Sequence, residues 1–253
     1  MFADERKSKI IDMIHQNHSV TTSELTEIFQ VSLETIRRDL ESMEKQGLLK
    51  RVHGGAVSVK ELQSYSNLTV RSNSHQAEKR KLAFMACSYI KEKDYIALDT
   101  GSTAIELAKA ICERFQNLTI LTNSLEVFHI LSERKEYQII LAGGYYLSEE
   151  KSFYGHLTLD MIRQLHVKKC FITPSGVSLD FGISDHVQEL IDIQRAMLEI
   201  ADEVYILADS SKFESYAPLK ICDLDTSYQY LTDTSLPENI FETYQKASIS
   251  IKK

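Results

Sequence analysis

From residue 76 onward, short apolar segments alternate with amphipathic helical stretches, and this alternation restricts the fold more than any other feature of the sequence. We expect strands at 95–99, 118–122, 137–142, 168–173, 204–209 and 228–233, and helices at 76–92, 103–114, 125–134, 157–165, 187–201 and from Pro237 onward. Short apolar strands separated by such helices form a mainly parallel sheet covered on both faces. Ligands of these α/β sheets bind at the carboxyl ends of the strands.

The first sixty residues have a different pattern, which predicts a helix-turn-helix followed by a two-stranded wing. The expected elements are a helix over about 4–17, a second helix starting at the capping box Thr21-x-x-Glu24, a third at 33–46, and strands at 48–52 and 56–59. Ser32 is expected to cap the third helix and Gly47 to end it. Its apolar residues are expected to face inward: Leu33, Ile36, Leu40 and Met43.

This N-terminal module carries residue types suited to DNA. Because Ile36 and Leu40 fix the buried side of the third helix, Arg38 lies nearly opposite them. The first turn of such a helix meets base edges, and glycines in a wing let the backbone come close to phosphate. The DNA-binding candidates are Ser32, Glu34, Thr35, Arg37, Arg38, Lys50, Arg51, His53, Gly54 and Gly55. The alternative is a solvated face held by a Glu34–Arg38 pair, worth a few tenths of a kcal/mol.

Charge and composition agree with two functional parts. Residues 1–60 contain as many Lys and Arg as Asp and Glu, so the whole net charge of −7 belongs to the rest of the chain. A neutral module can present a local basic face to nucleic acid where a uniformly acidic chain would be repelled. The N-terminus is too charged for a signal peptide and no apolar run is long enough to span a membrane, so we expect a cytoplasmic protein. The four separated cysteines and eight histidines suggest neither a metal nor a cofactor.

The segment Asp99-Thr100-Gly101-Ser102-Thr103 follows the first strand and opens a helix. Asp-Thr-Gly is also the catalytic tripeptide of aspartic proteases, but those are β proteins that need two copies, and this chain has one. A turn of small residues at the start of a helix instead favours an anion, which meets free N–H groups and the positive helix end. A simple Ser/Thr helix cap without a ligand is the alternative.

Similar small or polar residues follow other strands. They are Thr122-Asn123-Ser124, Ala142-Gly143-Gly144 and Asp209-Ser210-Ser211-Lys212. Each alone is an ordinary turn or cap. Together they bring hydroxyls, bare backbone and one cation to the same edge of the sheet, where parallel strands end.

Residues 31–56, VSLETIRRDLESMEKQGLLKRVHGGA, resemble the DNA-binding signature of the DeoR family of bacterial transcriptional regulators. EKRKLA (78–83), LDTGST (98–103), TNS, AGG, ADSSKF (208–213) and LTD (231–233) follow in the family's order. The resemblance implies a winged helix-turn-helix and an effector domain similar to ribose-5-phosphate isomerase. It also implies a phosphorylated-sugar pocket lined by Lys79, Gly101, Ser102, Thr103, Asn123, Ser124, Gly143, Gly144 and Lys212. We add Asp99 to these candidates.

The chain departs from the family pattern around this pocket. Ser102 stands where threonine is usual, and Tyr145, Tyr146 and Leu147 follow the paired glycines in place of a basic residue. The segment 173–176 is Thr-Pro-Ser-Gly, and Gln194 replaces a lysine. The loss of one or two cations from a phosphate pocket would weaken binding or change the ligand.

We therefore expect residues 1–57 to form a winged helix-turn-helix, 58–75 a linker and 76–253 a sensing domain. The expected function is a regulator of transcription, a repressor of a sugar-utilisation operon, that binds double-stranded operator DNA and responds to a phosphorylated sugar. One helix-turn-helix reads a half-site, so we expect a homo-oligomer, a dimer or a tetramer. The alternatives are an isomerase-like enzyme with Asp99 or Asp185 as its base, and a DNA-binding protein with a decayed pocket.

Overall fold

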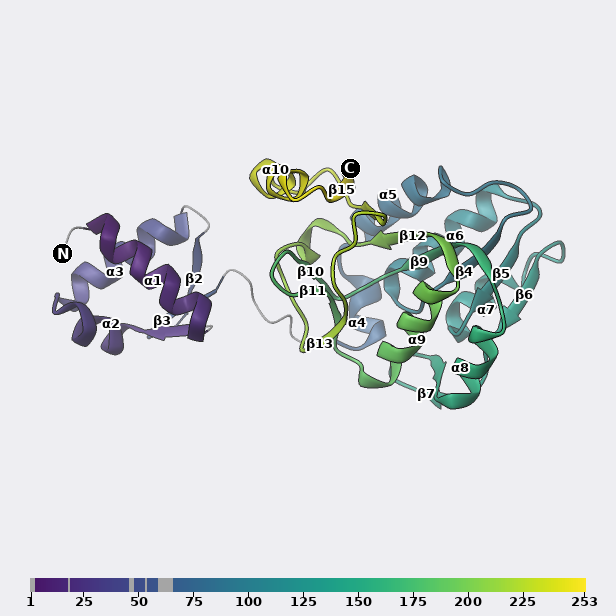
Figure 1. The fold of residues 1–253 in the computed structure, drawn as a ribbon, viewed down its shortest axis with the longest axis horizontal. Coiled ribbons are helices and arrows are strands. Elements are labelled where there is room, and N and C mark those ends of the chain that lie inside the picture. Colours follow the sequence, from purple (N-terminus) through teal and green to yellow (C-terminus); the bar gives the residue numbers. More distant parts are fainter. Residues whose placement is uncertain (1–2, 18, 46–47, 53, 59–65) are drawn as a thin grey trace. The chain divides into compact units, whose positions relative to one another are not determined.

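The computed structural model describes residues 3–17, 19–45, 48–52, 54–58 and 66–253. The chain divides into two compact units, residues 1–61 and 62–253, which are described separately (Figure 1). Among the described residues, no helix is both long and apolar enough to cross a membrane.

The N-terminal unit consists of three helices and a small antiparallel sheet. Its elements are α1 (Ala3–Asn17), β1 (Ser19–Thr21), α2 (Thr22–Phe29), α3 (Leu33–Lys45), β2 (Leu49–Val52) and β3 (Gly55–Ser58). The sheet has the order β1-β3-β2, so the prediction of a two-stranded wing missed a third strand. At three residues, β1 is too short for its period to be recognised in the sequence.

Most sequence signals for the helices of this unit are confirmed. Thr21 and Glu24 form the predicted capping box at the start of α2. Ile36, Leu40 and Met43 are buried, but the prediction that Leu33 faces inward was wrong, because its side chain is 43% exposed. Leu33 is the first residue of α3, where the helix has not yet reached the core. Gly47 lies outside the described residues.

A buried ion pair links α1 to α3. Nε of Arg6 donates to a carboxylate oxygen of Asp39 at 2.6 Å, and both side chains are less than 10% exposed. Loss of one partner of such a pair leaves an uncompensated buried charge, which costs about 3–5 kcal/mol.

We predict that Asp39→Ala destabilises the N-terminal unit by about 3 kcal/mol, because it leaves the Arg6 guanidinium buried without its carboxylate. Hydrogen–deuterium exchange of the full chain measures this as faster exchange of the amides in α1 and α3. The control is Glu5→Ala, which removes the carboxylate of the exposed Glu5–Lys9 ion pair. Similar exchange rates in the two variants would contradict the assigned role of the buried pair.

The C-terminal unit is built on a seven-stranded sheet whose neighbouring strands are all parallel. In spatial order the strands are β15 (Ser250–Lys252), β14 (Gln229–Leu231), β12 (Ala201–Leu207), β9 (Val167–Ile172), β4 (Tyr95–Leu98), β5 (Thr119–Thr122) and β6 (Gln138–Leu141). The predicted parallel α/β sheet is confirmed. The chain proceeds from β4 outward to β6 and then continues from β9 in the opposite direction. The strand order therefore reverses between β4 and β9, which is where such sheets bind ligands.

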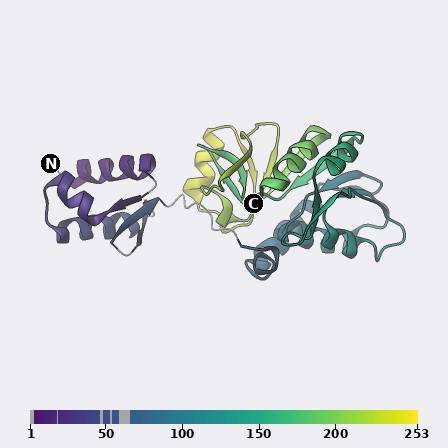
Figure 2. The ribbon, with the colours of Figure 1, turned by 90° about the horizontal axis from the view of Figure 1, so that it is seen from below.

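Helices cover both faces of this sheet (Figure 2). The helices on one face are α5 (Gln76–Cys87), α6 (Ser102–Arg114) and α7 (Leu125–Leu131), and those on the other are α8 (His156–Arg163), α9 (Gln188–Glu199) and α10 (Glu238–Lys246). Successive strand residues point to opposite faces of the sheet, each of which has its own apolar core. Phe171 packs with α5 and α6, whereas Cys170 and Ile172 pack with α8 and α9. This alternation explains why the strands are apolar on both sides.

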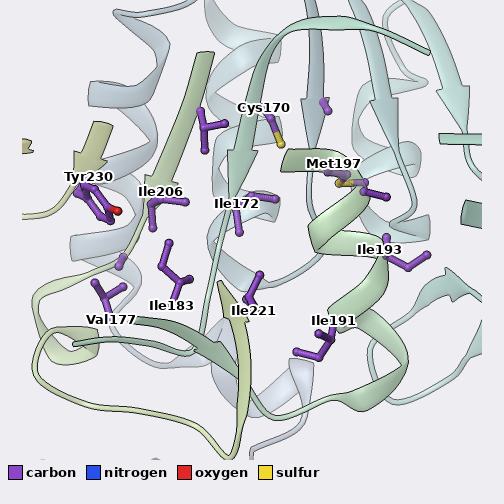
Figure 3. Close-up of a cluster of buried hydrophobic side chains, with 14 of the residues drawn as sticks. Cys170, Ile172, Val177, Ile183, Ile191, Ile193, Met197, Ile206, Ile221 and Tyr230 are labelled. Atoms are coloured by element: carbon purple, nitrogen blue, oxygen red, sulfur yellow. The ribbon is translucent and has the colours of Figure 1, made fainter. Parts of the chain in front are cut away.

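Several short strands escaped the sequence analysis. They are the hairpin β7 (Tyr145–Leu147) and β8 (Ser152–Tyr154), and a second antiparallel sheet of β10 (Gly176–Ser178), β11 (Gly182–Asp185) and β13 (Leu219–Cys222). Figure 3 shows Ile183 and Ile221 of this second sheet pointing into the same cluster as Ile172 and Ile206. The second sheet thus extends the core beyond the carboxyl ends of β9 and β12.

The predicted linker, 58–75, includes an ordered helix. Leu68–Asn73 form α4, which Asn67 caps by accepting a hydrogen bond from the Val70 amide at 3.1 Å. Leu68 is buried, and α4 contacts α6 within the C-terminal unit. The segment expected to be a linker and entry segment thus contains a short helix that the sequence did not reveal, because a six-residue helix with one buried apolar side chain has no visible period.

Candidate functional site

The exposed face of α3 carries the arginines expected to meet DNA. Arg37 is exposed, and Arg38 lies 3.3 Å from Glu34, with both of these side chains more than 60% exposed. A pair this exposed is weak, so Arg38 can exchange Glu34 for another anion at little cost. Ser32 caps α3: its hydroxyl accepts from the Thr35 amide at 3.2 Å and lies 2.9 Å from the Thr35 hydroxyl. Ser32 and Thr35 are thus already held in the first turn of this helix.

Among the wing residues that the structure describes, Arg51 is a basic side chain exposed to solvent. Its backbone N–H donates to the Glu44 carboxylate at 2.8 Å. Gly54 has φ +87°, a conformation that favours glycine, and Gly55 packs against β1, where a Cβ would lie 2.1 Å from the Val20 oxygen. Gly55 therefore has a packing role in addition to the expected role of letting the backbone come close to DNA phosphate. The side chain of Lys50 and all of His53 lie outside the described residues.

In the C-terminal unit, Asp99 lies at the end of β4, beside the point where the strand order reverses. The side chain is fully buried, and its two oxygens accept hydrogen bonds from the amides of Thr100 at 2.7 Å and Thr173 at 3.1 Å. Gln194 adds a third donor, Nε2, at 3.1 Å. The pKa of Asp99 is raised to about 7, mainly by burial and also by the nearby Asp185, although these three donors favour the charged form. Asp99 thus joins the loop after β4 to the loop after β9.

Gln194 links the two buried aspartates of this region. Its Nε2 donates to Asp99 and, at 3.0 Å, to Asp185, whose other oxygen accepts from the Ser175 hydroxyl and the His186 amide. A lysine here would neutralise part of this negative charge, whereas glutamine supplies only N–H groups. The sequence identified Gln194 as a departure but did not predict its partners.

The loop after Asp99 leads directly into α6. Gly101 is the N-cap residue, with φ +128°, and a Cβ there would lie 2.9 Å from the Thr173 hydroxyl. Gly101 has no side chain to cap the helix, so the first N–H groups of α6 lack the usual acceptor. Ser102 and Thr103, both more than 90% buried, form the first turn. Such a helix start can hold an anion.

Three basic side chains, Arg71, Lys79 and Lys212, lie close together, and Arg71 belongs to α4, which contacts α6. The pKa of Lys79 is lowered to about 8, mainly by burial and also by the positive charges of Lys212 and Arg71, while Asp209 opposes the shift. The pKa of Lys212 is also lowered, first by burial and then by Arg71, against the opposing effect of Asp209. Cations near enough for one to lower the pKa of another are close enough to share an anion. Lys79 and Lys212 were predicted site residues.

Arg71, which belongs to α4, was missed by the sequence analysis. It forms an ion pair with the buried carboxylate of Glu150. Lys79 is tied to the same helix, because its Nζ donates to the backbone oxygens of Arg71 at 2.5 Å and Ser74 at 2.8 Å. The one available sequence signal was Asn67, a cap residue four positions before this arginine.

The remaining predicted residues make mainly structural contacts. Asn123 donates from Nδ2 to the Phe153 oxygen at 2.9 Å, and Ser124 caps α7 by accepting from the Val127 amide at 3.3 Å. Both therefore hold α7 and the β7–β8 hairpin. Gly143 and Gly144 follow β6, two strands away from β4, and contact the start of α8. The contacts described for these four residues are thus with α7, the β7–β8 hairpin and α8.

Gly144 and its neighbour provide a matched test of this packing role. A Cβ on Gly144 would lie 2.2 Å from the Thr158 hydroxyl and 2.6 Å from the Tyr154 oxygen, whereas a Cβ on Gly143 would meet nothing within 4 Å. We predict that Gly144→Ala lowers the free energy of unfolding by about 1–3 kcal/mol and that Gly143→Ala changes it little. Urea unfolding followed by circular dichroism measures both. Equal stability of the two variants would refute the packing role.

Within the described ranges, no group of three or more His, Cys, Asp or Glu side chains is placed to hold a metal ion. The geometry instead offers an exposed basic helix face in one unit and a cation-rich helix start in the other.

Comparison with known proteins gives matches in both units. Residues 6–62 match the model of the DeoR-like helix-turn-helix domain, and residues 74–234 match that of the DeoR C-terminal sensor domain. The transcriptional repressor AccR of Agrobacterium fabrum is 35% identical over 83% of this chain and 81% of its own length. The L-fucose operon activator of Haemophilus influenzae is 31% identical over 93% of this chain and 94% of its own.

Other similarities are more distant or less informative about function. The HTH-type transcriptional regulator YulB of Bacillus subtilis is 35% identical over 93% of this chain and 91% of its own. Among solved structures, ribose 5-phosphate isomerase A of Neisseria gonorrhoeae is 14% identical, with a TM-score of 0.40 over 53% of this chain and 52% of its own.

Proposed function

Because this chain belongs to the DeoR family of transcriptional regulators, we propose that it represses a sugar-utilisation operon and that a phosphorylated sugar releases it from the operator. The observation that carries the proposal is the start of α6, which no side chain caps, beside α4, whose Arg71 oxygen binds Lys79. Lys212 lies close to Lys79 and Arg71. Relatives named for the aga operon and the L-fucose operon support a sugar as the signal. The protein would act in the cytoplasm, where its operator lies.

The DNA-binding part of the proposal rests on α3 and the wing. We assign Thr35 and Arg38 to base edges or nearby phosphates, and Arg37, Arg51 and His53 mainly to the DNA backbone. Since one such module reads one half-site, at least a dimer is required, with half-sites about one DNA turn apart or a multiple of that distance.

The sensing part assigns the phosphate group of the effector to the first turn of α6. The free N–H groups of Ser102 and Thr103 would donate hydrogen bonds to the phosphate oxygens, and Lys212 would contribute a positive charge. To change DNA occupancy, this ligand must bind the DNA-competent and DNA-incompetent arrangements with different affinities.

An isomerase-like enzyme is less well supported. The two candidate bases are Asp99 and Asp185, and each accepts hydrogen bonds at both carboxylate oxygens from neighbouring residues. A general base must be within reach of a substrate proton, and Asp99 is completely buried. These contacts favour a structural role for both carboxylates.

The experiment that tests the proposal is fluorescence anisotropy of labelled DNA from upstream of the protein's own operon. The DNA is saturated with the full chain and then titrated with sugar phosphates, each compared with its unphosphorylated sugar. We expect one phosphorylated sugar to release the DNA while its parent sugar does not. Release by unphosphorylated sugars, or by none of either series, would contradict the proposed signal.

A second prediction concerns the phosphate contacts of the N-terminal unit. Replacing Arg37, Arg38 or Arg51 by alanine should reduce the slope of log affinity against log salt by about one for each lost phosphate contact. The control is Lys109→Ala, which removes an exposed cation of α6 in the C-terminal unit. If all three arginine variants keep the slope of the unmodified chain, the assignment is wrong.

A further inference from the structure

The chain enters the C-terminal unit through α4. This helix begins at Leu68, a few residues after the end of the N-terminal unit at residue 61. A six-residue helix is too short to be stable by itself, so α4 depends on contacts with its surroundings. Any rearrangement of α4 changes the point from which the chain continues to the DNA-binding unit.

Two charged groups hold α4 in its position. Nζ of the buried Lys79 binds two backbone oxygens at the end of the helix, those of Arg71 and Ser74. The guanidinium of Arg71 binds the carboxylate of Glu150, whose side chain is 2% exposed. Nε of Arg71 is buried and has no hydrogen-bond partner among the described residues, so this guanidinium can form a further bond.

The carboxylate that holds Arg71 belongs to the candidate effector site. Glu150 accepts a hydrogen bond through its backbone oxygen from the Thr100 hydroxyl at 3.4 Å, and Thr100 immediately precedes the N-cap of α6. Arg71 is also close enough to Lys79, Lys212 and His186 to lower the pKa of each. The helix start, the basic side chains and Glu150 therefore form one charged cluster.

We propose that, before the effector binds, Glu150 occupies the position on Arg71 that the effector's anionic group will take. When the effector binds, its anion displaces Glu150 from Arg71, and α4 shifts as a result. This inference rests on the proposed function, because it uses the same phosphate site. It assigns Arg71 to the effector and identifies Glu150 as an internal competitor. It also gives the signal a route to the DNA-binding unit along the chain itself.

The exchange has a cost that makes the coupling measurable. When Arg71 leaves, Glu150 remains a buried carboxylate without its cation, which opposes effector binding. Removing that charge should therefore strengthen anion binding, although Glu150 contributes no atom to the anion. A residue with a purely structural role would instead weaken binding when changed.

The test uses the full chain, with inorganic phosphate as the probe and chloride added to keep the ionic strength constant. Glu150→Gln removes the charge and keeps the size, and Glu149→Gln is the matched control, because Glu149 is its exposed neighbour. The midpoint of phosphate binding is read from the rise in melting temperature. Hydrogen–deuterium exchange separately follows residues 66–75, which contain α4, and residues 100–105 at the start of α6.

We expect Glu150→Gln to lower the phosphate midpoint about tenfold, Arg71→Gln to raise it about tenfold, and Glu149→Gln to leave it unchanged. In the unmodified chain, phosphate should alter exchange in both segments with a common midpoint. In Glu150→Gln, residues 66–75 should exchange faster than in the unmodified chain before phosphate is added.

Two results would overturn the inference and spare the proposed function. One is a phosphate midpoint in Glu150→Gln that is equal to or higher than that of the unmodified chain. The other is phosphate protection of residues 100–105 with no change in residues 66–75. If phosphate changes neither segment and no sugar phosphate releases the operator, the proposed effector site itself is wrong and the inference fails with it.

Discussion

The site in the C-terminal unit depends on one buried carboxylate, Asp99, which accepts hydrogen bonds from both sides of the point where the strand order reverses. Thr100 belongs to the loop after β4 and Thr173 to the loop after β9, so these contacts fix the two loops relative to each other. The resulting turn leaves Gly101 against the Thr173 hydroxyl and directs the first turn of α6 toward the same edge of the sheet. Parallel strands meet at this edge, which explains why the charged groups gather there.

Acidic and basic side chains lie close together at this edge of the sheet. Lys212 and Arg71 both lower the pKa of Lys79, and Arg71 lowers that of Lys212, so these cations lie close together. Glu150 and Asp209 compensate part of this charge from within the chain. An anion with two or three negative oxygens, such as a phosphate group, would form charge-assisted hydrogen bonds with such cations.

The sequence predicted those features of the fold that depend on local pattern. Alternating strands and helices identified the parallel sheet, and Thr21 with Glu24 identified a helix start, because both signals lie within a few residues. Contacts between distant segments were not predictable in this way. The sequence indicated Gly144 as a ligand position, whereas in the structure a glycine is needed there because a Cβ would collide with the Thr158 hydroxyl on α8. Arg71 was missed because its meaning arises only when α4 packs beside residues 79 and 150.

In the proposed mechanism, binding at the sheet edge and binding of DNA are coupled in one molecule. Coupling between two sites is reciprocal, so each ligand must change the affinity of the other by the same factor. The most direct measurement is calorimetric titration of the releasing sugar phosphate into the full chain, once free and once saturated with operator DNA. The proposed mechanism predicts weaker sugar-phosphate binding to the DNA complex, by the same factor by which this ligand weakens DNA binding. Equal affinity in the two titrations would contradict it.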